Sequence, residues 1–351
     1  MAQLLEYLEA AVKNGASDLF IVAGGPVGIK LGGKIEAADD IRLMPDITEA
    51  LIRETYALAN RSMDRLFDSG DDDFSFAVGG LARFRVNAYQ QRGSLAAVIR
   101  VVSFSIPDYK SLGIPENIMK LSELTYGMVL ITGTAGSGKS TTQACIVDRV
   151  NHTRNCHIIT LEDPIEFLHR DDESIVSQRE IAIDTQDFLS ALRSCLRQAP
   201  DVIQLGELRD AETIRTAMTA AETGHLLIAT LHTKGAVNTV DRIIDTFPSD
   251  QQAQIRLQLS SVLRTVVCQQ LLPREGGGLV PAFEIMNTTN AVRSMIRDNK
   301  THQINNVIAS GSADGMMSMD QSILALYKDG VISKETALAY CDNPEQMKRL
   351  I

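Results

Sequence analysis

The chain has 351 residues, of which 44% are hydrophobic and 22% are charged. This composition is that of a folded globular protein with room for two domains, and it excludes a disordered or fibrous chain. A formal net charge of −10 also disfavours nonspecific binding to nucleic-acid duplexes, because such binding needs a basic face to neutralise phosphates.

The cysteines and the N-terminal segment bear on the compartment. The five cysteines, Cys145, Cys156, Cys195, Cys268 and Cys341, include no C-x-x-C pair, so they predict no zinc site and suit a reducing cytoplasm. No apolar run has the length of a transmembrane helix, and the N-terminus lacks the basic and apolar regions of a signal peptide. We therefore expect a cytoplasmic protein that reaches a membrane only through partners.

Residues 1–102 predict a small α+β domain. An apolar face over 4–12 that stops at Asn14-Gly15 predicts a helix. The triplet Asp71-Asp72-Asp73 fits either a metal site or a solvated turn, and we favour the turn. Further elements are expected at 19–22, 28–31, 47–58, 74–78, 82–89 and 95–102, the last three as an antiparallel meander.

Residues 103–114, with Pro107 and Gly113, predict an interdomain linker. Over 115–351 strands alternate with helices, which is typical of an α/β domain with a parallel sheet and helices on both faces. Strands are expected at 128–132, 157–161, 202–205 and 225–231, and helices at 139–150, 186–198, 211–222, after Asp210 as N-cap, and 251–267. A hairpin around Gly276-Gly277-Gly278 leads to a helical C-terminal region.

The segment Gly133-Thr134-Ala135-Gly136-Ser137-Gly138-Lys139-Ser140 matches G-x-x-x-x-G-K-[ST] between an apolar strand and a helix. This context predicts a P-loop that binds a nucleoside triphosphate. The glycines let successive N–H groups converge on a phosphate, Lys139 supplies charge to the β- and γ-phosphates, and Ser140 supplies a hydroxyl to Mg²⁺. These eight residues and Thr141 are the predicted ATP-binding set.

Two predicted strands lead into acidic residues that are candidates for metal binding or catalysis at the phosphates. The strand over 201–205 leads to Gly206-Glu207, so Glu207 is the candidate ligand of Mg²⁺, placed at the end of a strand that neighbours the P-loop strand. The other strand leads to Glu162, Asp163 and Glu166, where a carboxylate would orient and deprotonate the attacking water. The alternative that the four acids only solvate loops stays open, most of all for Glu162 and Asp163.

His225 and His232 stand at the two ends of the strand expected at 225–231. Seven residues of strand separate them by roughly 23 Å, which is too far to chelate one metal. His232, at the carboxyl end, is the candidate contact of the γ-phosphate, whereas His225 is equally well explained as a structural residue.

Three arginines lie in the N-terminal meander. Arg83 and Arg85 fall on one face of a strand, and Arg100 closes the next strand. From spacing alone they read as ordinary surface residues, although ring-forming ATPases often complete their site with a guanidinium from another domain or subunit.

Taken in order, these motifs resemble the secretion ATPase superfamily, and within it the type IV pilus retraction ATPases. The resemblance includes 15–19 and 82–87, the P-loop as Walker A, 162–166 as Asp box, 206–210 as Walker B and 223–233 as His box. Ala291-Val292-Arg293-Ser294-Met295-Ile296-Arg297 is similar to the AIRNLIRE motif of the retraction branch. We expect neither the extra N-terminal domain nor the four-cysteine zinc insertion of the assembly ATPases.

The resemblance implies a PAS-like N-terminal domain and a RecA-like core, assembled as a homohexamer with ATP at domain and subunit junctions. It implies Glu166 as catalytic glutamate, Glu207 as Walker B acid and Arg85 and Arg100 as arginine fingers, and Lys139 and His232 complete the catalytic set. Hydrolysis would rotate one domain against its neighbour and power pilus retraction and twitching motility. The expected partner is the platform protein of the pilus machine, at the cytoplasmic face of the inner membrane, and no nucleic acid is expected.

The sequence departs from the family pattern at several positions. Phe20 stands where His is common, Ala199 replaces the usual Asp, and Gln204 interrupts an apolar strand. In the C-terminal motif, Ser294 and Met295 replace Asn and Leu. Two alternatives therefore stand beside the motor: a RecA-like nucleic-acid translocase, which needs a basic channel with aromatic residues, and a slow-cycling nucleotide-gated regulator of the pilus machine.

Overall fold

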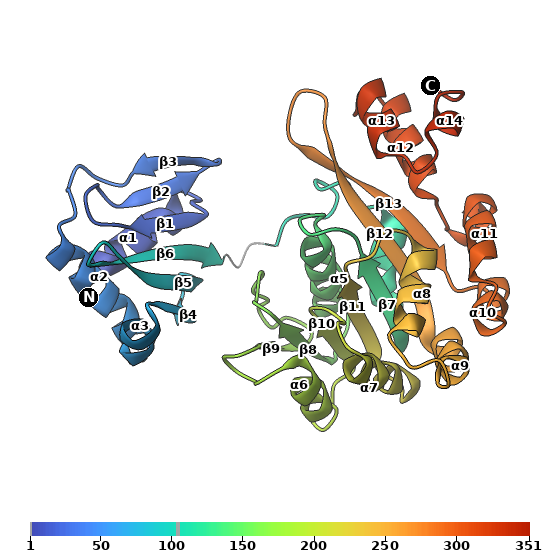
Figure 1. Cartoon of the computed structure of the whole chain (residues 1–351), viewed down its shortest axis with the longest axis horizontal. Helices are drawn as coiled ribbons and strands as arrows, with labels where there is room; N and C mark the ends of the chain where they lie inside the picture. Colours follow the sequence, from blue (N-terminus) through green and yellow to red (C-terminus); the bar gives the residue numbers. More distant parts are fainter. Residues whose placement is uncertain (1, 103–105) are drawn as a thin grey trace. The chain divides into compact units, whose positions relative to one another are not determined.

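The structure is a computed structural model that describes residues 2–102 and 106–351. The contacts divide the chain into two units, each of which we describe by itself (Figure 1). The first unit contains the described residues up to Val102 with Glu166–Leu168, and the second contains Ile106–Ile165 and His169–Ile351.

The described part of the predicted linker belongs to the second unit. Residues 103–105 lie outside the described residues. Beyond them, Ile106, Tyr109, Leu112 and Ile114 pack against a buried cluster of the second unit. Residues 106–114 therefore pack as part of the second unit.

The first unit is an α+β domain, in agreement with the predicted fold class. Its described strands form an antiparallel sheet with the order β3-β2-β1-β6-β5-β4. One face of this sheet packs against α1 and α2 around Leu8, Leu51 and Phe84. The elements are α1 Ala2–Lys13, β1 Asp18–Ile21, β2 Gly28–Leu31, β3 Lys34–Ala37, α2 Pro45–Leu58, α3 Asp64–Ser69, β4 Asp71–Val78, β5 Ala82–Gln91 and β6 Ser94–Val102.

The acidic triplet at the start of β4 is not a solvated turn, so that prediction is wrong for Asp72. The Asp72 side chain is buried and accepts hydrogen bonds from Arg61 at 2.8 and 2.9 Å and from the Tyr56 hydroxyl at 3.1 Å. Since successive side chains of a strand point to opposite faces, Asp72 turns inward while Asp71 and Asp73 stay exposed. Burial and the adjacent Asp72 charge raise the pKa of Tyr56.

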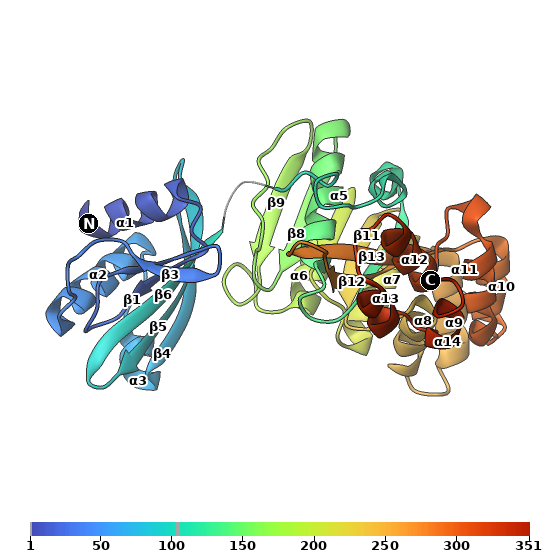
Figure 2. The same cartoon turned by 90° about the horizontal axis from the view of Figure 1, so that it is seen from above.

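The second unit is built on a sheet whose described strands follow the order β13-β12-β7-β11-β10-β8-β9 (Figures 1 and 2). All neighbouring pairs in it are parallel except β12 with β13. The predicted parallel-sheet core is thereby confirmed. The strands are β7 Gly127–Thr132, β8 His157–Glu162, β9 Ile175–Glu180, β10 Val202–Leu205, β11 Leu226–Leu231, β12 Leu263–Pro273 and β13 Leu279–Asn287.

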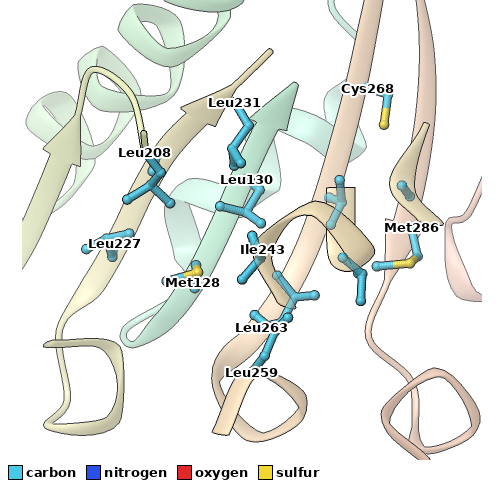
Figure 3. Close-up of a cluster of buried hydrophobic side chains, with 14 of the residues drawn as sticks. Met128, Leu130, Leu208, Leu227, Leu231, Ile243, Leu259, Leu263, Cys268 and Met286 are labelled. Atoms are coloured by element: carbon cyan, nitrogen blue, oxygen red, sulfur yellow. The ribbon is translucent and has the colours of Figure 1, made fainter. Parts of the chain in front are cut away.

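Helices cover both faces of this sheet. One face packs on α5 through residues such as Val129 and Ile146, and the other packs on α6 to α9, where Met128 and Leu227 meet Ile243 (Figure 3). The helices are α4 Glu116–Met119, η1 Lys120–Glu123, α5 Lys139–Thr153, α6 Phe188–Cys195, α7 Ala211–Glu222, α8 Ala236–Asp245, α9 Gln252–Val262, α10 Asn290–Arg297, η2 Thr301–Gln303, α11 Ile304–Ser310, η3 Ser312–Asp314, α12 Met319–Lys328, α13 Lys334–Tyr340 and α14 Pro344–Met347.

The long helix expected at 251–267 is wrong beyond Val262. Helix α9 ends there, and Leu263 begins β12, which pairs with β7 on one side and β13 on the other. The run Thr265-Val266-Val267 is β-branched. Its burial between two strands outweighs the apolar periodicity that suggested a helix. The hairpin around Gly276-Gly277-Gly278 joins β12 to β13, as predicted.

Candidate nucleotide site

The predicted P-loop leaves β7 and enters α5, which begins at Lys139. Gly133, Gly136 and Gly138 have φ values of 148°, 75° and 87°, which glycine adopts without strain. A Cβ at Gly133 would lie 2.3 Å from the carbonyl oxygen of Gln269, and one at Gly138 would lie 2.8 Å from the Gln269 amide nitrogen. Two of the three glycines are therefore required by the close approach of β12 as well as by the backbone angles.

The Lys139 side chain is buried and lies over its own loop. Its ammonium donates to the carbonyl oxygens of Gly133 at 3.0 Å and Thr134 at 2.9 Å. A phosphate bound in the loop would replace these two acceptors with a charged one, which forms a stronger hydrogen bond. Ser140 and Thr141 follow in the first turn of α5, where free N–H groups and the helix dipole favour an anion.

The carboxyl ends of the parallel strands bring Glu207 and His232 to the edge of the sheet that carries the P-loop. The Glu207 carboxylate lies 3.1 Å from Nε2 of His232 and forms an ion pair with Arg209. These three side chains line a cavity of about 390 Å³. We expected the strand before Glu207 to neighbour β7. It does not, because β11, which leads to His232, lies between β10 and β7.

Burial lowers the pKa of His232 from its ordinary value, and the positive charges of Lys139 and Arg209 lower it further. The influence of Lys139 joins the P-loop and the His box in one electrostatic environment. A neutral imidazole is the form that this environment favours near neutral pH. His225, by contrast, lies at the other end of β11, with Nδ1 2.9 Å from the carbonyl oxygen of Ala220, which fits the structural interpretation.

The Asp box divides into a buried and an exposed part. Glu162 ends β8 and is only 8% exposed, and it accepts hydrogen bonds from Thr160 at 2.6 Å and Gln178 at 3.2 Å. The alternative that Glu162 only solvates a loop is therefore wrong. Asp163, which is followed by a cis peptide bond to Pro164, and Glu166 are exposed. Glu166 falls in the short segment that groups with the first unit, whereas the P-loop belongs to the second unit.

The three arginines of the meander share one face of the first unit's sheet, where Arg100 is exposed and Arg83 and Arg85 are half-buried. Arg85 stands directly opposite Arg100 in the register of β5 and β6. The Nε atom of Arg100 lies 2.9 Å from a carboxylate oxygen of Asp18 on β1. Both predicted arginine fingers are therefore placed side by side on one sheet, and their relation to the P-loop stays a prediction.

The segment similar to the retraction motif forms α10. Val292 and Ile296 are buried against α9, whereas Ala291 and Arg297 are exposed. Arg293 donates from Nε to the carbonyl oxygen of Ser260, at 3.0 Å, near the end of α9. The two substituted positions, Ser294 and Met295, are partly buried. The described contacts of this motif are those of a packed helix that holds the end of α9.

Two of the departures from the family pattern have local consequences. Ala199 has a φ of 51°, a left-handed conformation that costs a residue with a Cβ more than it costs Asn, Asp or Gly. Gln204 is 4% exposed in β10, and its side-chain oxygen has no hydrogen-bond partner among the described residues. Both features lie close to the Walker B strand.

Sequence reasoning missed a cavity beside the start of α5. It holds about 240 Å³ and is walled by Leu112, Leu271 and Pro281, with Thr141 at the P-loop side. Gln269 of β12 also lines it and accepts a hydrogen bond from Thr142 at 2.7 Å. The β-branched run at 265–267 could have indicated the strand that carries Gln269 and Leu271, but we interpreted it as part of a helix.

Within the part of the chain that the structure describes, no helix is long and apolar enough to cross a membrane. The same described residues contain no group of three or more His, Cys, Asp or Glu side chains placed to hold a metal.

A strand, a glycine-rich loop and a helix, with a carboxylate and a neutral imidazole at the same edge, define a P-loop ATPase of the RecA-like class. The family of Type II/IV secretion system proteins matches this chain over residues 2–313. The chain belongs to that family.

Individual relatives agree with the family. A type IV pilus retraction ATPase, PilT, from Pseudomonas aeruginosa is 43% identical over 343 residues, which cover 97% of this chain and 99% of the relative. The type IV pilus ATPase PilU of the same organism is 38% identical over 98% of this chain and 90% of its own length. A crystal structure of the pilus retraction motor PilT with bound ADP has a TM-score of 0.89, with 43% identity and 98% of both chains covered.

Proposed function

We propose that this chain is the ATP-hydrolysing motor that retracts type IV pili. The observation that carries the proposal is the full-length likeness to a retraction ATPase, at 43% identity over 97% of the chain, in a protein whose P-loop, Glu207 and His232 meet at one sheet edge. The nucleic-acid translocase and the slow-cycling regulator are not favoured by these relatives.

In the proposed reaction, the P-loop amides and Lys139 bind the phosphates of ATP. The Ser140 hydroxyl and the Glu207 carboxylate are oxygen donors of the kind that Mg²⁺ prefers, so these residues fit the expected metal. Bound there, Mg²⁺ would neutralise charge on the β- and γ-phosphates. The apolar cavity at Leu112, Leu271 and Pro281 suits the nucleobase, because it lies beside Thr141 at the start of α5.

The remaining site residues act on the attacking water and on the developing charge. Glu166 would accept the proton of the water, and the neutral His232 would turn its single N–H from Glu207 to a γ-phosphate oxygen. Arg85 and Arg100, supplied by a neighbouring protomer of a homohexamer, would stabilise charge on that phosphate. Hydrolysis would then turn one unit against its neighbour and drive the platform protein at the cytoplasmic face of the inner membrane.

Phosphate release by the purified protein tests the ATPase part of the proposal. We expect Mg²⁺-dependent turnover that falls at least about a hundredfold in Lys139→Ala and in Glu166→Ala, and that single-stranded DNA leaves unchanged. Stimulation by DNA would instead support the translocase. Wild-type turnover no faster than that of the two variants would support the regulator.

Deletion of the encoding sequence in its own bacterium tests the direction of force. We expect cells with surplus pili and without twitching motility, restored by the wild-type chain but not by Lys139→Ala. Cells without pili would point to an assembly motor.

A further inference from the structure

A row of side chains, Thr132, Cys268 and Glu284, crosses three neighbouring strands of the sheet next to the P-loop. In the strand register, Thr132 of β7 faces Cys268 of β12, and Cys268 faces Glu284 of β13. Cys268 is buried, at 2% exposure, between these two neighbours in the register. Thr132 immediately precedes Gly133, the first P-loop residue, so this row begins at the nucleotide site. On its other side, Thr132 faces Leu231, the last residue of β11.

Glu284, at the other end of the row, is 6% exposed. One of its oxygens accepts a hydrogen bond of 2.7 Å from the backbone N–H of Ala236, the first residue of α8. Burial and, to a lesser degree, the Asp342 charge raise the pKa of this carboxyl group, while the Ala236 N–H at the start of α8 favours its charged form.

The segment between His232 and Ala236 is short and is held at both ends. Glu284 holds Ala236. The Thr239 hydroxyl lies 2.7 Å from the Thr233 hydroxyl, 2.8 Å from the Gly235 carbonyl oxygen and 3.5 Å from the Thr132 hydroxyl. Since His232 directly precedes Thr233, the position of its ring depends on these anchors.

We propose that Glu284 is a positioning residue for hydrolysis: by fixing the start of α8 it holds the loop that places His232 against Glu207. This inference rests on the proposed role of His232. A shift of about 1 Å in a group that contacts the reacting phosphate is enough to slow chemistry severely. Nucleotide binding should be spared, because Glu284 acts through its hydrogen bond to Ala236 at the start of α8, which is not a P-loop residue.

The test is a double-mutant cycle on the full-length protein. Glu284→Ala should lower kcat about tenfold with KM within about twofold, and Glu284→Gln, which keeps one acceptor oxygen, should recover most of the loss. In a His232→Ala background, Glu284→Ala should cause little further loss, because the two residues act in one unit. A full tenfold loss in that background, or a rise in KM with kcat unchanged, would overturn the inference.

A second variant and a readout without catalysis keep the test decisive. Thr239→Val, which removes the other anchor at nearly constant volume, should behave like Glu284→Ala, and Glu275→Gln on the exposed tip of the same hairpin should behave like wild type. Hydrogen exchange should rise at residues 231–236 in Glu284→Ala more than at residues 139–145, whether or not the wild type turns over ATP. Unchanged exchange at 231–236 would contradict the inference, while a wild type as slow as Lys139→Ala would contradict only the proposed function.

Discussion

His232 is the residue whose protonation most directly links this site to pH. Burial and the charges of Lys139 and Arg209 lower its pKa below the ordinary value of about 6.5. The neutral ring is thus the form present at neutral pH, and protonation makes both ring nitrogens donors and pairs the charged ring with the Glu207 carboxylate. We expect kcat/KM to fall as one proton binds, with a midpoint below about 6.5.

A pH series of phosphate release from about pH 5 to pH 8 measures this midpoint. In His232→Gln the limb should disappear, and the remaining activity should be nearly constant over that range. A midpoint above the ordinary histidine pKa, or the same limb in the variant, would show that another group controls the acid side.

His169 links pH to stability instead of activity. Burial, and to a lesser degree the charge of His152, lower the pKa of His169 to about 4, and its Nδ1 has no hydrogen-bond partner among the described residues. The folded chain therefore binds fewer protons than the unfolded chain between about pH 4 and pH 6.5, so stability is lost as pH falls through this window. We expect His169 to cost about 2 kcal/mol of unfolding free energy between pH 7.5 and pH 5.

Urea unfolding at these two pH values, with wild type and His169→Gln compared, measures the cost. The variant should lose about 2 kcal/mol less than the wild type on acidification. His302→Gln, at an exposed position, is the matched control and should follow the wild type. Equal losses in all three proteins would contradict the lowered pKa.

At the scale of elements, the P-loop depends on its contact with β12. A Cβ at Gly133 would meet the backbone oxygen of Gln269 at 2.3 Å, which cannot give way, whereas one at Gly136 would meet nothing within 4 Å. Both positions have positive φ, so both substitutions carry backbone strain of about 1 kcal/mol. We expect Gly133→Ala to weaken ATP binding at least about a hundredfold and Gly136→Ala no more than about tenfold.

Titration with a fluorescent ATP analogue gives both dissociation constants, and circular dichroism shows whether each variant is folded. Similar affinities for the two variants would mean that β12 does not constrain the loop in solution.

The elements themselves differ in how far the sequence predicted them. Strands β7, β10 and β11 and helices α5 and α7 follow from apolar runs, a glycine motif and the Asp210 cap, which accepts from the Thr213 N–H at 2.9 Å. Strands β3 and β9 and helix α3 were missed, because they are short and carry few buried apolar residues. β12 was misread as helix because its partners in the sheet, far away in sequence, decide its conformation.

At the scale of the whole molecule, the proposed ring requires that one protomer complete the site of another. Lys139→Ala and Arg85→Ala protomers, each inactive alone, should regain activity when coexpressed in equal amounts. Random mixing would join an intact P-loop to an intact arginine at about a quarter of the sites. Phosphate release by the copurified mixture, with its molar mass from light scattering, measures this recovery.

Arg53→Ala, which removes an exposed arginine of the same unit, serves as the control and should be active by itself. No recovery in the mixture, although both variants are present in one assembly, would mean that Arg85 acts within its own protomer or not at all.

The sequence by itself determined the nucleotide chemistry and the α/β class, because a P-loop is a local pattern whose backbone and side-chain roles are set within eight consecutive residues. It also marked Glu207 and His232 as candidates, because each follows an apolar strand. Only the tertiary structure decided that Asp72 is a buried ion-pair partner, that 263–273 is a strand, and that Glu284 holds the start of α8. These outcomes depend on contacts between residues distant in sequence, and such contacts exist only once the sheet has formed.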